Sequence, residues 1–132
     1  MTVSISDGFS RLELARTGDP DEHYTASSYL TNVAVVSDPF SVIVEAHART
    51  FASFLQALSQ LHQSMAGEAK LDFWNEEHSI ILKGDGRGGL QIDATITDGR
   101  TPCSAYLRVG IVLDQSYLPG IISELREEFP IE

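Results

Sequence analysis

The sequence predicts an α+β fold, built mainly of antiparallel strands, in a single domain that spans residues 1–132. Apolar residues alternate with polar ones before residue 50, recur at helical spacing over residues 51–65, alternate again over residues 69–113 and end in a second helical pattern. The connections between the predicted strands are short, which suits antiparallel neighbours better than helical crossovers between parallel strands.

Four strands are predicted before residue 50. The dipeptide Asp7-Gly8 indicates a turn between the first two, and the polar segment 17–22 indicates an exposed loop after them. The next two segments are rich in β-branched and aromatic residues and flank Pro39, which predicts a hairpin. The predicted strands are 3–5, 12–14, 29–36 and 40–48.

A central helix follows at residue 51. Thr50 can cap its start, and Gly67 lies just past its end, where a left-handed residue is favoured. Its apolar positions share one helical face, which is expected to be buried: Phe51, Phe54, Leu55, Leu58, Leu61 and Met65.

Strands resume after this helix, and a second helix closes the chain. The glycine-rich segment 84–89 could resemble a phosphate-binding loop, but an alternating strand rather than a helix follows it, which favours a hairpin. Pro119 fits the first turn of the last helix, at about residues 116–128. The predicted strands are 69–73, 80–82, 90–96 and 104–113, and the buried face of the last helix is Tyr117, Leu118, Ile121, Ile122, Leu125 and Phe129.

The charge of the chain is strongly negative, with 19 Asp and Glu against 9 Lys and Arg and a formal net charge of -10. Nucleic acid is therefore not an expected partner, because phosphate binding relies on clustered basic residues. A negative surface instead favours a basic protein partner and speeds association with it. The alternative is that the acidity only keeps the protein soluble.

The location predicted from the sequence is the cytoplasm. A single cysteine, Cys103, excludes an intramolecular disulfide and suits a reducing compartment. The N-terminus lacks the pattern of a signal peptide, and no apolar run approaches the roughly 20 residues that cross a bilayer. We therefore expect no membrane association.

No catalytic, metal or cofactor site is predicted, so we expect that the protein is not an enzyme. The four histidines are dispersed without metal-ligand spacing, and His78 with Glu76 and Glu77 is interpreted as a solvated corner. Glu45 and His47 share one face of a strand, either as an acid/base couple or as part of a polar face.

Trp74 lies in the polar register of its strand together with Asp72. An aromatic side chain on a wet sheet face is typical of an interface anchor, although a neighbouring loop could also cover it.

Three segments resemble a known family: Phe51-x-x-Phe54-Leu55-x-x-Leu58, Gly67-Glu68-Ala69-x-Leu71-x-Phe73 and Leu113-Asp114-x-Ser116-Tyr117-Leu118-Pro119-x-Ile121-x-x-Glu124-Leu125-Arg126-x-x-Phe129-Pro130. With them the chain resembles the WapI-type immunity proteins of polymorphic toxin systems, a family of small bacterial proteins. The resemblance covers nearly the whole chain, but it rests chiefly on core positions and transfers no catalytic residue.

The resemblance implies an immunity protein that binds and blocks a cognate toxin, often a nuclease, in the cytoplasm of the producing cell. An acidic inhibitor would suit the basic groove of a nuclease. Charge and expected exposure, rather than the family, predict the partner-binding residues: Asp72, Trp74, Glu76 and Glu77, with Asp85 and Asp93 secondary.

Two other functions are consistent with the sequence. One is a domain that binds a small ligand in a pocket between sheet and helix, with Glu45, His47 or Tyr106 as polar groups. The other is a homodimer or larger homo-oligomer, formed through an unpaired edge strand near residues 3–14.

Overall fold

The computed structural model describes residues 2–17, 29–49, 51–73, 78–98 and 105–129. These residues form eight strands and two α-helices, which confirms the predicted α+β class. The elements are β1 (Val3–Ser6), β2 (Ser10–Arg16), β3 (Tyr29–Ser37), β4 (Phe40–Arg49), α1 (Phe51–Ser64), β5 (Ala66–Phe73), β6 (Ser79–Asp85), β7 (Gly89–Asp98), β8 (Ala105–Asp114), a 3₁₀ turn (Gln115–Tyr117) and α2 (Leu118–Glu128).

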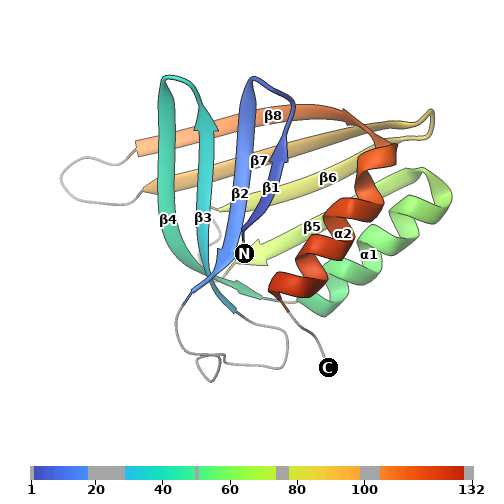
Figure 1. The fold of residues 1–132 in the computed structure, drawn as a ribbon, viewed down its shortest axis with the longest axis horizontal. Helices are drawn as coiled ribbons and strands as arrows, with labels where there is room; N and C mark the ends of the chain where they lie inside the picture. The colour runs from blue at the N-terminus through green and yellow to red at the C-terminus, as the bar shows by residue number, and fades with distance from the viewer. Residues whose placement is uncertain (1, 18–28, 50, 74–77, 99–104, 130–132) are drawn as a thin grey trace.

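The strands form one antiparallel sheet in which each strand lies beside its neighbour in sequence, from β1 to β8. The link between β4 and β5 is short: only Ala48 with Phe73 and Arg49 with Asp72 are paired. There the sheet bends into a first half-sheet, β1–β4, and a second half-sheet, β5–β8, whose strands cross steeply in Figure 1. Strands β3 and β4 contact β7 and β8, so the halves pack face to face around the core.

The alternation predicted for the strands is confirmed. Val3 and Ile5 in β1 and Leu12 and Leu14 in β2 point into the core, as do Leu90, Ile92, Ala94 and Ile96 in β7. The intervening residues face outward, because successive side chains of a strand point to opposite faces. Each fully buried Leu or Ile contributes about 1.5–3 kcal/mol relative to an exposed one.

Helix α1 buries the predicted face except at its last position. Phe51, Phe54, Leu55, Leu58 and Leu61 are buried, but Met65 is exposed, so its predicted burial was wrong. The helix ends at Ser64, and Met65 itself adopts the left-handed conformation, with φ of 63°, that was expected of Gly67. Gly67 lies within β5, and Thr50 lies outside the described residues.

Helix α2 begins at Leu118 with Pro119 in its first turn, as predicted. The predicted buried residues Leu118, Ile121, Ile122, Leu125 and Phe129 are buried. Tyr117 was wrongly assigned to this face: it belongs to the preceding 3₁₀ turn, where three residues per turn rotate the side chain away from the core.

The two helices pack against each other beside the bent sheet (Figure 1). The ring of Phe129 stacks on that of Phe51 with 4.3 Å between centroids, which joins the end of α2 to the start of α1. The backbone N–H of Arg16 donates a hydrogen bond of 3.0 Å to Glu128, which connects α2 to β2.

A buried glutamine links three connecting segments of the fold. Gln115 is 6% exposed, and its Nε2 donates to the carbonyl oxygens of Met65 at 2.7 Å and Gly89 at 3.0 Å. Gln115 thus connects the end of α1, the β6–β7 hairpin and the start of α2. No sequence pattern predicted this role.

Candidate functional site

The candidate surface is the outward face of the second half-sheet. Strand alternation brings Asp72 and Asp93 to it, because Leu71 and Phe73 in β5 and Ile92 and Ala94 in β7 point into the core. Both aspartates are half-buried. The structure therefore places two of the six predicted partner-binding residues on one face of the sheet.

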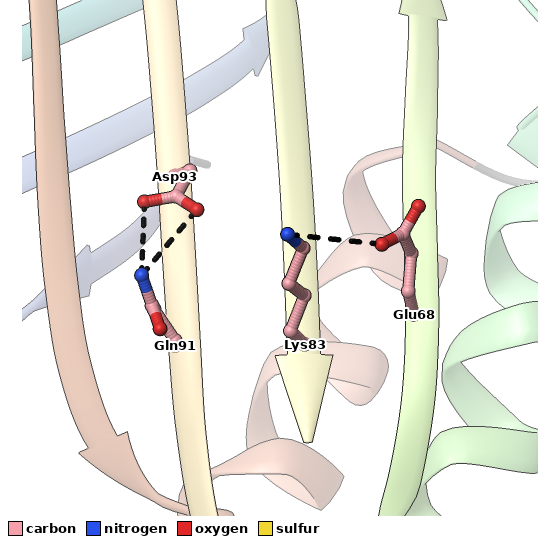
Figure 2. A network of polar contacts seen from close by, with 4 residues as sticks. All are labelled: Glu68, Lys83, Gln91 and Asp93. Carbon is pink, nitrogen blue, oxygen red and sulfur yellow. Dashed lines mark hydrogen bonds and ion pairs between the residues drawn. The ribbon is translucent and has the colours of Figure 1, made fainter. Parts of the chain in front are cut away.

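Polar contacts cross this face in Figure 2. Lys83 Nζ of β6 lies 3.9 Å from Glu68 Oε2 of β5, and both side chains are about half exposed. On β7, Gln91 Nε2 donates to Asp93, at 3.3 Å from Oδ1 and 3.5 Å from Oδ2. The neighbouring amide thus orients the carboxylate of Asp93 along the strand.

Basic residues share the candidate surface with the acids. Lys70 of β5 and Arg108 of β8 are exposed, and strand pairing places Lys70 beside Ile81 and Ile81 beside Asp93. The described part of this face is therefore of mixed charge rather than uniformly negative. A partner that recognised it would have to match a pattern of both signs.

Asp85 lies at the end of β6 and shapes the hairpin to β7. Its Oδ1 accepts hydrogen bonds from the backbone N–H groups of Arg87 at 2.7 Å and Gly89 at 2.9 Å. These two bonds stabilise the ionised carboxylate and so lower the pKa of Asp85 below its usual value. The predicted hairpin is confirmed, and the adjacent Gly86 and Gly88 have the positive φ values that this turn requires.

A shallow hollow of about 290 Å³ lies at this end of the candidate surface. Its lining includes Lys83, Asp85, Gln91 and the exposed Val112 of β8. The hollow is open to solvent, and apolar and polar groups line it together. Such a recess can receive a side chain of a partner protein.

The other three predicted partner-binding residues, Trp74, Glu76 and Glu77, lie outside the described residues, as does Cys103. His78, which follows them, is not part of a solvated corner as predicted, because it is only 6% exposed. Its Nδ1 accepts a hydrogen bond from the backbone N–H of Thr97 at 3.3 Å, and its ring meets the ring of Phe73 edge to face.

Glu45 and His47 lie on the outward face of β4, where Glu45 is exposed and His47 is half-buried. The core and the other half-sheet lie on the opposite face of this strand. The two residues therefore do not line an interior pocket between sheet and helix, as the ligand-binding hypothesis required. The side chain of Tyr106 is outside the described part of the structure.

Exposed apolar side chains are the feature that sequence reasoning missed. Phe9 and Phe40 lie in or beside hairpin turns, and Ile43 and Val112 point outward from β4 and β8. The signal was present for Phe9, which directly follows the turn dipeptide Asp7-Gly8 and so falls outside the buried register.

The described residues contain neither a cluster of metal ligands nor a membrane-spanning helix. No group of three or more His, Cys, Asp or Glu side chains in this part of the chain could hold a metal ion. Neither described helix is long and apolar enough to cross a membrane.

Comparison with known proteins identifies the family. The family model described as "Immunity protein WapI-like family" matches residues 3–130. No curated protein and no solved structure matches the chain. Because the matched segment contains all the strands and helices described above, the chain belongs to the WapI-like immunity protein family.

Proposed function

We propose that this protein is a non-enzymatic immunity protein that binds and neutralises a cognate toxin domain in the cytoplasm of the producing cell. The observation that carries the proposal is the family match over residues 3–130. An immunity protein acts by occupying the toxin, so it requires a complementary surface and no catalytic group of its own.

The partner we propose is a basic domain, in particular that of a nuclease. A nuclease needs a positive groove for its phosphate substrate, and the net charge of -10 on this chain favours binding in or beside such a groove. Nucleic acid itself is repelled by the same charge.

The proposed contact region is the outward face of the second half-sheet and the segment after β5. It comprises Asp72, Trp74, Glu76, Glu77, Asp85 and Asp93. The outward positions of Asp72 and Asp93 support this assignment, and so does the hollow beside Asp85. Asp85 contributes its negative charge while its Oδ1 holds the hairpin turn.

The first experiment is co-expression with the toxin domain encoded by the neighbouring gene. We expect growth to be rescued by this protein and the two purified proteins to form a complex. Equal killing with and without this protein would refute the function.

The contact region is tested by comparing Asp93→Ala with Glu127→Ala, an exposed carboxylate on α2. Each variant removes one negative charge. We expect the dissociation constant of the complex to rise for Asp93→Ala and to change little for Glu127→Ala, as measured by calorimetry. The reverse order would move the contact region to α2.

A further inference from the structure

Two turns with exposed aromatic residues lie side by side at one end of the first half-sheet. Phe9 is in the β1–β2 turn and is 87% exposed, and Phe40 opens β4 after the β3–β4 turn and is 66% exposed. Ser10 pairs with Ser37, their side-chain oxygens are 3.2 Å apart, and Ser37 in turn pairs with Phe40. We call Phe9 and Phe40 the aromatic turn pair. Figure 1 shows both turns at the same end of the sheet.

The β1–β2 turn, which carries Phe9, lies near the candidate surface. The pKa of Asp7, in the β1–β2 turn, is lowered by the backbone N–H of Ser10, then by that of Phe9, and more weakly by that of Val112. Val112 therefore lies close to this turn, and it is also an exposed residue lining the hollow on the second half-sheet. The β1–β2 turn and the hollow therefore both lie near Val112.

The β1–β2 turn does not require an aromatic residue at position 9. Asp7 accepts hydrogen bonds of 2.8 Å from the N–H groups of Phe9 and Ser10, and Gly8 takes the positive φ, so neither feature of the turn depends on the side chain of Phe9. Large apolar side chains that are this exposed, on two neighbouring turns, are typical of protein contact sites.

The charges around the pair are acidic. Asp7 and Asp38 lie in the same two turns, and the nearby cation Arg11 forms an ion pair with Glu13 on its own strand. In an isologous contact between two copies of this chain, these carboxylates would face the same carboxylates of the second copy. The two molecules, each with a charge of -10, would repel each other there. A basic partner removes this repulsion.

We propose that the aromatic turn pair anchors the cognate toxin domain, with Phe9 and Phe40 entering apolar recesses that basic residues surround on the toxin. This inference rests on the proposed function and adds a second part to its contact region. Apolar anchors supply affinity at the centre of an interface, while the carboxylates of the two turns favour a toxin domain whose contact site is edged by basic residues.

The test compares Phe9→Ser, Phe40→Ser and their combination with Tyr117→Ser. Tyr117 is a matched control, because it is 59% exposed and belongs to the 3₁₀ turn before α2 rather than to either hairpin turn. The probe is the toxin domain encoded by the neighbouring gene, and the dissociation constant is measured by calorimetry. We expect an increase of about thirtyfold or more for the double variant, and less than about threefold for Tyr117→Ser.

Unchanged thermal unfolding of all variants shows that the fold is intact, as expected for exposed side chains. If the wild-type protein binds the toxin domain and the double variant binds equally well, the anchor is refuted while the immunity function stands. If the wild-type protein does not bind, the proposed function itself fails. A wild-type dimer in light scattering that the double variant abolishes would assign the pair to self-association and overturn the inference.

Discussion

Gly84 occupies a position where the fold leaves no room for a side chain. A Cβ there would lie 2.6 Å from the carbonyl oxygen of Met65 and 2.9 Å from Nε2 of Gln115. We expect Gly84→Ala to lower the free energy of unfolding by about 1–3 kcal/mol, because backbone and a buried amide must move. Urea denaturation followed by circular dichroism measures the change.

Gly120 is the matched control for this prediction. A Cβ at Gly120 would meet nothing within 4 Å, and the residue lies in α2. Gly120→Ala is expected to leave the stability unchanged or to raise it by up to about 1 kcal/mol, because alanine favours the helix. An equal loss of stability in Gly84→Ala and Gly120→Ala would contradict the steric explanation.

Three aspartates make the stability depend on acidic pH. Backbone N–H groups in turns lower the pKa of Asp7, Asp85 and Asp114 below the ordinary value of 3.8. Because the folded-state pKa is depressed, the stabilisation is complete above the unfolded-state pKa and is lost as the pH falls through the folded-state value.

We therefore expect urea midpoints of the wild-type protein to fall between about pH 5 and pH 2. An Asp7→Asn, Asp85→Asn, Asp114→Asn variant should be less stable near neutral pH and should lose less stability over that interval. Between about pH 6 and pH 7 these three carboxyls do not titrate, so the two proteins should show the same slope. If the urea midpoints of the two proteins fell equally over the acidic interval, the turns would not depend on ionised aspartate.

At the scale of elements, Gln115 holds three connections together. Substitution to Ala removes the donor to Met65 and Gly89 and leaves their carbonyl oxygens without this bond. We expect Gln115→Ala to destabilise the protein by about 1–3 kcal/mol. Gln56→Ala, on the exposed face of α1, serves as the control and should stay within about 0.5 kcal/mol of the wild-type protein. Similar values for the two variants would argue against the bridging role.

The strands and helices could be predicted because each carries its own hydrophobic period. The buried alternation of Leu90, Ile92 and Ala94, and the helical face of Phe51, Phe54 and Leu58, are visible locally in the sequence. Tertiary contacts are not visible in this way. Gln115 has the sequence context of an exposed polar residue, and only the meeting of α1, the β6–β7 hairpin and α2 buries it.

The candidate site, like the fold, was predictable where it follows from local alternation and not where it depends on tertiary contacts. The outward positions of Asp72 and Asp93 follow from strand alternation. That Lys70 would share the face with them depends on the register between β5, β6 and β7, which no single segment determines. The proximity of Val112 to the β1–β2 turn depends on the bend between β4 and β5, which brings the half-sheets together.

For the molecule as a whole, net charge and charge placement have different effects on association. A net charge of -10 attracts any basic protein at long range, and salt screens this attraction within about 8–10 Å. Placement of the acids near the contact region determines which orientations of the encounter succeed. Two pairs of glutamates in this chain can separate the two effects.

Glu76 and Glu77 belong to the proposed contact region, whereas Glu124 and Glu127 are exposed on α2. Glu76→Lys/Glu77→Lys and Glu124→Lys/Glu127→Lys change the net charge equally. If the proposed region is correct, the first double variant slows association with the toxin domain more strongly and flattens its dependence on salt concentration, as measured by stopped flow. The second double variant should lose only the smaller part of the association rate, which comes from the net charge. Equal losses would mean that the charge of the whole molecule, and not the segment after β5, steers the toxin to this protein.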